Sequence, residues 1–333
     1  MPIFLHGLAL QYYRGIGPNV QKLRPFKDFN FFIGANNAGK STVLDFISKY
    51  LLAGPKRPVR MSPLEQYRGE KTGTPTAAVG VPVQTFIQSV YKRIGAKAEN
   101  NNVKEAVPKI SGLLADGDFI WIALPFGQFP GTSYLAGQPS ATAFRKVLAD
   151  HQLSNLWSSL TGAGGGGIEE HWIPQTLATL LNAQQESLTF PEVQLIPALR
   201  QIGPKSEKFA DFSGRGLIDR LAEIQSPDHD KREERLIFDR INKFLQTVTG
   251  RVSAQIEVPH NREHILVHMD NKVLPLLSLG TGTHEVIMIA AFCTISENQI
   301  VCIEEPEIHL HRDSPDDSGA EVNILRFSDL PAR

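Results

Sequence analysis

Apolar and polar positions along the 333-residue chain fall into short blocks that predict alternating strands and helices. Apolar runs typical of buried strands occupy residues 3–12, 29–33, 77–86, 119–124, 193–196 and 299–303. Apolar residues at helical spacing occupy residues 42–53, 172–187, 216–249 and 286–295. A β-hairpin is predicted from residues 256–259 and 265–269. This mixture of elements predicts an α/β fold.

Two segments interrupt this pattern. Residues 53–80 are rich in Pro, Gly, Lys and Arg, which predicts an excursion on the surface. Residues 162–167 are mostly glycine, and two interpretations stay open for them. They form either a flexible loop or a place where the backbone approaches another group closely.

Composition excludes some classes of protein. The formal net charge is −1, so no global field attracts the chain to nucleic acid or to an anionic membrane. Cys293 and Cys302 lie in apolar runs and are predicted to be small buried residues in a reducing compartment. No apolar stretch approaches the roughly 20 residues that span a bilayer, and the N-terminus lacks a signal-peptide pattern. We expect a cytoplasmic protein without membrane contact.

The segment GANNAGKS, residues 34–41, separates an apolar run from a helical pattern. It meets the pattern G-x-x-x-x-G-K-[S/T] with Gly34, Gly39, Lys40 and Ser41. Glycines let backbone N–H groups turn toward phosphates, Lys40 reaches the β- and γ-phosphates, and Ser41 can bind Mg²⁺. The alternative is a glycine turn that only joins a strand to a helix. The flanking strand and helix favour a site for a nucleoside triphosphate, with ATP and Mg²⁺ expected.

The apolar run 299–303 ends in two acids, Glu304 and Glu305. In phosphate-loop ATPases a carboxylate at such a strand end holds Mg²⁺, and the next one activates water. We therefore predict Glu304 as the metal residue and Glu305 as the general base. The alternative is a charged strand end exposed to solvent.

Residues 276–285, LLSLGTGTHE, form a predicted loop ahead of the apolar helix 286–295. Exposed backbone N–H groups and hydroxyls at a helix N-terminus bind anions. A plain turn with a helix cap is the alternative. A second anion-binding loop in one chain suggests that this loop closes on ATP held by another subunit.

These motifs, in this order, resemble the ABC-type ATPase heads of the RecF/SMC class, and most of all the OLD-like ATPases. The latter act in bacterial genome maintenance and anti-phage defence. FFIGANNAGKSTVLDFI is similar to the family's Walker A region, LSLGTGTHEVIMIAA to its signature loop, and IVCIEEPEIHLH to its Walker B region. VQLIPALRQI also resembles a segment of these ATPases. The resemblance covers roughly residues 1–311.

The resemblance implies a P-loop NTPase fold with a mixed central sheet flanked by helices. The head would comprise residues 1–54 and 191–311, with a helix-and-strand insertion at 55–190 and an atypical tail at 312–333. Two heads would dimerise about ATP, with DNA or a separate nuclease subunit as partner. Lys40 and Glu305 would be catalytic, and Ser41 and Glu304 would serve Mg²⁺. The nucleotide-binding residues would be Gly34, Asn36, Asn37, Ala38, Gly39, Lys40, Ser41, Thr42, Ser278, Gly280, Thr281 and Gly282.

Some features depart from the family pattern. Residues 312–333 contain no histidine that could sense the γ-phosphate. We also expect no Toprim nuclease domain, which the full OLD nucleases carry C-terminally. Three origins stay open for this tail: a truncation, a frameshift or a variant of the family. His309 and His311 are expected to pack or cap locally. Arg200 is either a phosphate or arm contact or part of a surface ion pair.

Several functions remain open at this stage. The leading hypothesis is an Mg²⁺-dependent ATPase, and the second is a non-hydrolysing regulatory subunit that dimerises on ATP. A third is an inactive fragment. A small-molecule kinase also has a phosphate loop but needs neither LSLGTGTHE nor EPEIHLH. The family's Q-loop glutamine is either Gln66 or Gln201.

Overall fold

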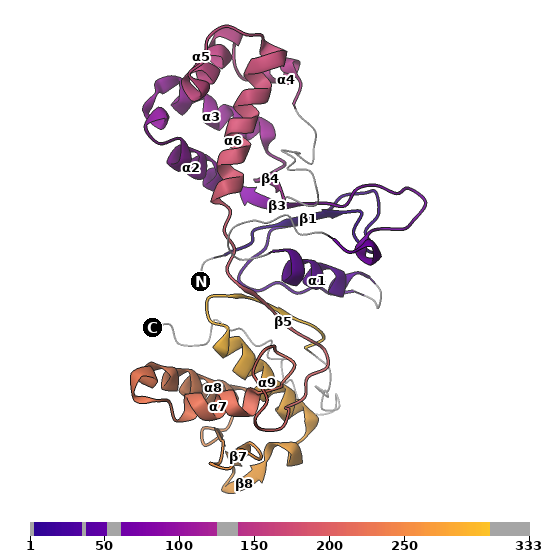
Figure 1. Cartoon of the computed structure of the whole chain (residues 1–333), viewed down its shortest axis with the longest axis vertical. Helices are drawn as coiled ribbons and strands as arrows, with labels where there is room; N and C mark the ends of the chain where they lie inside the picture. The colour runs from indigo at the N-terminus through magenta and orange to yellow at the C-terminus, as the bar shows by residue number, and fades with distance from the viewer. Residues whose placement is uncertain (1–2, 35–37, 52–60, 125–138, 307–333) are drawn as a thin grey trace, which may run out of the picture. The chain divides into compact units, whose positions relative to one another are not determined.

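The computed structural model describes residues 3–34, 38–51, 61–124 and 139–306. These residues form a mixed α/β protein that divides into two units (Figure 1). The first unit comprises residues 1–43 and 52–191, and the second comprises residues 44–51 and 192–333. The division runs through helix α1, Lys40–Tyr50, whose first turn belongs to the first unit.

The first unit contains a four-stranded antiparallel sheet with the order β2-β1-β3-β4. Its strands are β1 (Leu8–Gln11), β2 (Gln21–Leu23), β3 (Thr76–Pro82) and β4 (Phe119–Ala123). Ala9 and Ala78 are cross-strand partners, and both pack against the buried indole of Trp121. Small side chains on two strands therefore leave room for one large aromatic on a third.

Helices cover most of the remainder of the first unit (Figure 1). They are α2 (Val83–Ile94), α3 (Asn101–Leu114), α4 (Ala141–Arg145), α5 (Asp150–Thr161) and α6 (Ile173–Ser187). The predicted strand 77–86 ends early, because α2 begins directly after Pro82. Phe86 and Val90 are buried one helical turn apart, so the last part of that apolar run is one face of a helix.

Neighbouring side chains approach the glycine-rich segment 162–167 closely. The indole N–H of Trp172 donates to the carbonyl of Gly165 at 2.8 Å. The amide of Gly167 donates to Nδ1 of His171 at 3.3 Å, and a Cβ on Gly166 would lie 3.1 Å from the same histidine. These contacts support the second interpretation of residues 162–167, in which the glycines allow other groups to approach the backbone closely.

The predicted strand at residues 29–33 is wrong. This segment forms no strand, and the side chains of Phe31 and Ile33 are 65% and 93% exposed. Asn30 instead makes a local turn, exchanging hydrogen bonds with the backbone N–H and carbonyl of Lys27. A strand needs a hydrogen-bonded neighbour, and none of the described strands pairs with this segment.

The described residues of the second unit form two small sheets, the later part of α1 and three further α-helices. The two predicted strands are confirmed as β5 (Val193–Ile196) and β9 (Ile300–Ile303), and they pair in parallel, which the sequence did not predict. The predicted hairpin is confirmed as β6 (Gln255–Glu257) and β7 (Leu266–Met269), to which β8 (Lys272–Pro275) adds an edge strand. The helices are α7 (Leu217–Gln225), α8 (Arg235–Thr249) and α9 (Thr281–Ile295).

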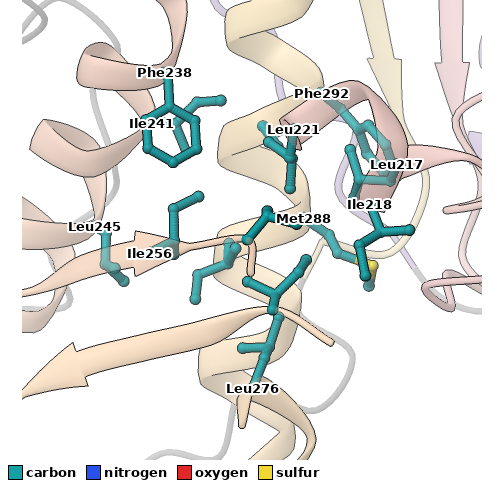
Figure 2. Packing of buried hydrophobic residues seen from close by; sticks show 14 of the residues in the cluster. Leu217, Ile218, Leu221, Phe238, Ile241, Leu245, Ile256, Leu276, Met288 and Phe292 are labelled. Carbon is teal, nitrogen blue, oxygen red and sulfur yellow. The ribbon is translucent and has the colours of Figure 1, made fainter. Parts of the chain in front are cut away.

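A large apolar core joins the three helices and most of the strands of the second unit (Figure 2), and Phe244, Val286 and Ala290 form a separate, smaller cluster. Leu221 of α7, Ile241 of α8 and Met288 of α9 converge in it, and Ile256 of β6 contacts the same cluster. All four side chains are almost completely buried. Apolar spacing in residues 216–249 thus predicted the faces that pack here, although it did not predict the break between α7 and α8.

The described strands lie in three separate sheets rather than in one mixed central sheet. The coarser expectation of an α/β fold is confirmed. Among the described residues, no helix is both long and apolar enough to cross a membrane.

Candidate functional site

The predicted phosphate loop folds locally as a glycine turn that leads into a helix, but the strand expected directly before it does not form. Gly34 and Ala38 are exposed, and α1 begins at Lys40. Gly39 has φ +96°, a backbone conformation that side chains other than glycine rarely adopt. The pattern therefore needs glycine at this position for a backbone reason. Asn36 and Asn37 lie outside the described residues.

Lys40 joins the two ends of this loop. Its Nζ donates a hydrogen bond to the carbonyl of Gly34 at 2.8 Å. Ser41 is exposed and Thr42 half-buried in the first helical turn, where backbone N–H groups have no acceptor inside the helix. A lysine charge and the backbone amides of a helix N-terminus are groups that bind an anion such as phosphate.

The described part of the loop is open around Gly39. Among the described residues, a Cβ built on Gly39 would meet no atom within 4 Å, and one built on Gly34 would lie 3.2 Å from the Cβ of Ala38. Gly34 is exposed and Gly39 half-buried. Close approach of a ligand to main-chain amides needs backbone of this kind, which side chains leave open.

The acidic strand end has an unusual backbone. Strand pairing continues one residue beyond β9, because the amide of Glu304 donates to the carbonyl of Ile196 at 3.0 Å. The next residue, Glu305, has φ +43°, which is uncommon for a residue that is not glycine. Such conformations cluster at functional sites, where surrounding contacts hold them. Glu304 is half-buried and Glu305 exposed, so the turn directs the second carboxylate toward solvent.

Both cysteines are free, as expected, and both lie near this strand in sequence or in space. Burial raises the pKa of Cys302 to about 12, and the carboxylate of Glu304 adds to the rise. Burial also raises the pKa of Cys293 to about 12. Both thiols are therefore neutral and unreactive near neutral pH, which excludes them as nucleophiles.

The glycine-threonine loop is shorter than predicted. Residues Leu276–Ser278 form one 3-10 turn, and α9 begins at Thr281 rather than at residue 286. The carbonyl of Gly280 accepts from the amides of Thr283 and His284, which starts the helix five residues early. Thr281 and Gly282 therefore lie in the first turn of α9. Ser278, Gly280 and Thr281 are exposed, and Gly282 is half-buried.

Arg200 is buried, which corrects the expectation of a phosphate contact, an arm contact or a surface ion pair. Its Nε donates to Oε2 of Glu285 at 2.6 Å, and the two side chains are 0% and 5% exposed. The guanidinium also donates to the carbonyls of Pro197, Glu304 and Glu305, at 2.8, 3.0 and 3.4 Å. One arginine thus joins the segment after β5, the first turns of α9 and the end of β9.

The sequence analysis did not identify Glu285 as a buried partner of Arg200, although the sequence contains an indication that this acid is paired. Glu285 is the only acid in the apolar stretch of α9. A charge among apolar residues is costly unless it is paired, so this pattern predicts a buried cation somewhere in the chain. It does not identify which arginine or lysine that is, because the partner lies 85 residues away.

The structure does not decide the roles of the remaining candidates, which are the two Q-loop glutamines and the two C-terminal histidines. Gln66 is exposed and forms a β-bridge with Tyr13, and the amide of Gln201 donates to the carbonyl of Ser213. Neither fact selects a Q-loop residue. His309 and His311 lie outside the described residues. The phosphate loop belongs to the first unit, whereas the acids and the glycine-threonine segment belong to the second.

A comparison of this chain with protein-family models and with curated proteins found no match. The motifs themselves, with their local geometry, therefore carry the functional argument.

Proposed function

We propose that this chain binds ATP with Mg²⁺ through residues 34–42 and is an ATPase head of the OLD/RecF-like class. The observation that carries the proposal is the geometry of the loop. Gly39 takes a glycine-only conformation directly before a helix, and Lys40 closes the loop onto Gly34. This arrangement presents a lysine charge and helix amides to a phosphate chain.

Magnesium fits the donors that this chain offers. Among the described residues, no group of three His, Cys, Asp or Glu side chains could hold a metal by itself. Mg²⁺ in nucleotide sites takes most of its ligands from phosphate oxygens and water, with one or two protein oxygens. Ser41 and Glu304 would supply those protein oxygens. The bound ion would neutralise charge that develops on the phosphates.

Hydrolysis would depend on Glu305. An exposed carboxylate on a held backbone turn can orient water and accept its proton. Ser278, Gly280, Thr281 and Gly282 would complete the site of a second copy of this chain, because most of them are exposed at the N-terminus of α9. DNA or a nuclease subunit as partner rests on the motif resemblance. The alternative is a subunit that binds ATP and dimerises without hydrolysing it.

Substituting Lys40 tests nucleotide binding directly. We expect Lys40→Ala to weaken ATP binding at least about tenfold, because it removes the charge that faces the phosphates. Isothermal titration with ATP and Mg²⁺ measures this. Lys49→Ala is the matched control, since Lys49 lies in the last turn of the same helix. Equal ATP affinity in wild type and Lys40→Ala would refute the proposal.

A further inference from the structure

The buried guanidinium of Arg200 is bonded to two elements that the proposed function uses separately. Glu285 lies in the second turn of α9, one turn beyond Gly280 and Thr281. The carbonyls of Glu304 and Glu305 belong to the turn that carries the proposed base. The mechanism described so far assigns no task to this buried arginine.

We propose that Arg200 is a positioning residue that couples the start of α9 to the turn at Glu304 and Glu305. The proposal rests on the proposed function, because it gives a role in ATP hydrolysis to residues outside the phosphate loop. Arg200 touches neither nucleotide nor water in this scheme. It acts through the backbone that holds Glu305.

The shape of the guanidinium makes this coupling specific. Its planar fork carries donors in fixed directions, so one side chain can bond Glu285 and two successive carbonyls at once. A lysine would keep the charge but present a single nitrogen. The bonds to the carbonyls therefore depend on arginine itself and not only on a positive charge.

The backbone at Glu305 needs such support. Its φ of +43° is a strained conformation for glutamate, and strain of this kind persists only where neighbouring groups enforce it. Arg200 bonds the carbonyl on each side of this φ angle, one from Glu304 and one from Glu305. Loss of those bonds would let the turn relax and redirect the carboxylate of Glu305.

The ion pair between Arg200 and Glu285 links the turn at Glu304 and Glu305 to the N-terminus of α9. Contact of a second copy with residues 278–282 would move or fix the N-terminus of α9, and Glu285 is part of the same rigid helix. A displacement of Glu285 would also displace Arg200, because both side chains are buried and hydrogen-bonded to each other at 2.6 Å. Contact at the start of α9 would therefore position Glu305 to accept a proton from the water that attacks the γ-phosphate, so that hydrolysis follows dimerisation.

Three variants separate this role from a purely structural one. Arg200→Lys keeps the charge, Glu285→Gln keeps the shape of the acceptor, and Arg240→Gln is the control. Arg240 of α8 also forms an ion pair within the second unit, to Glu297 in the turn after α9 at 2.9 Å, but the side chains of both partners are partly exposed. Cooperative thermal melting of each variant confirms folding before any other measurement.

The first readout is steady-state ATP hydrolysis. We expect Arg200→Lys and Glu285→Gln to lower kcat about 10²-fold while KM and ATP affinity change less than about threefold. Arg240→Gln should match wild type. A normal kcat in Arg200→Lys would overturn the proposal, because charge alone would then suffice.

The second readout is hydrogen exchange, which needs no turnover. We expect peptides that cover residues 300–306 to exchange faster in Arg200→Lys and in Glu285→Gln than in wild type. In Glu285→Gln the altered side chain belongs to α9, so a change at residues 300–306 would be transmitted from that helix. Unchanged exchange there in folded Glu285→Gln protein would overturn the coupling. If wild type fails to bind ATP, the proposed function falls, and the exchange result still decides whether Arg200 couples the two elements.

Discussion

Gly39 and Gly280 are both in exposed segments, but only the first is required by the backbone. Gly39 has φ +96°, so any side chain there is strained whatever space is free. Gly280 has φ −57°, and a Cβ on it would meet no atom within 4 Å. The fold itself therefore does not explain the glycine at 280. Close approach of another molecule would explain it.

Gly280→Ser tests this explanation. Serine is a preferred N-cap residue, so we expect the stability of the variant to equal or exceed that of wild type by a few tenths of a kcal/mol. We also expect weaker ATP-dependent dimerisation, because the new side chain occupies the space that the partner's nucleotide needs. Light scattering with ATP measures dimerisation. Gly112→Ala, at another open glycine in α3, should dimerise normally, and an unaffected Gly280→Ser would argue against contact at this position.

The lowered pKa of His284 makes the free energy of unfolding depend on pH. Burial lowers the pKa of His284 from its usual 6.5, and the charge of Glu285 opposes this only partly. The unfolded chain therefore binds more protons than the folded one just below pH 6.5, so the unfolding free energy falls as the pH falls through that range. Urea unfolding at pH 7.5 and pH 5 measures the loss. His284→Gln should lose less stability on acidification, with a remainder from His6, whose pKa burial also lowers. Equal losses in the two proteins would contradict this role.

At the scale of elements, α7, α8 and α9 pack together in the larger apolar core of the second unit (Figure 2). Leu221 on α7 is fully buried in this core, whereas Leu236 on α8 is 62% exposed. Identical substitutions at these positions therefore separate burial from helix propensity.

We expect Leu221→Ala to lower the unfolding free energy by about 2–5 kcal/mol, through lost burial and the cavity that remains. Leu236→Ala should change it by no more than about 0.5 kcal/mol. Chemical denaturation followed by circular dichroism measures both. A similar loss in both variants would mean that α7 does not pack as described.

At the scale of the whole molecule, the variant Glu305→Gln distinguishes an ATPase from a subunit that dimerises on ATP without hydrolysing it. If Glu305 is the general base, this variant binds ATP as wild type does, forms dimers that persist, and releases phosphate at least about 10²-fold more slowly. Native mass measurement with and without ATP, beside a phosphate-release assay, follows both properties. Wild-type dimers that form on ATP without phosphate release would favour the non-hydrolysing subunit. Equal phosphate release in wild type and Glu305→Gln would exclude Glu305 as the base.

Local chemistry made several features predictable from the chain alone. Glycine tolerance and helix periodicity act over a few residues, so the turn at Gly39 and the helix from Lys40 follow from their own sequence. The apolar run before Glu304 likewise indicated a strand, and β9 is that strand. An α/β fold followed from the order of such elements.

Features that depend on distant partners were decided only by the tertiary structure. Residues 29–33 have the composition of a strand but no hydrogen-bonded neighbour, and pairing cannot be read from one segment. Arg200 is buried because Glu285, 85 residues away, neutralises it, and Glu305 takes its strained conformation where Arg200 bonds the carbonyls around it. The sequence alone indicated the residues of the proposed nucleotide site. Long-range pairing and burial determined how the turn at Glu304 and Glu305 is held, because both are set by neighbours that the local pattern does not contain.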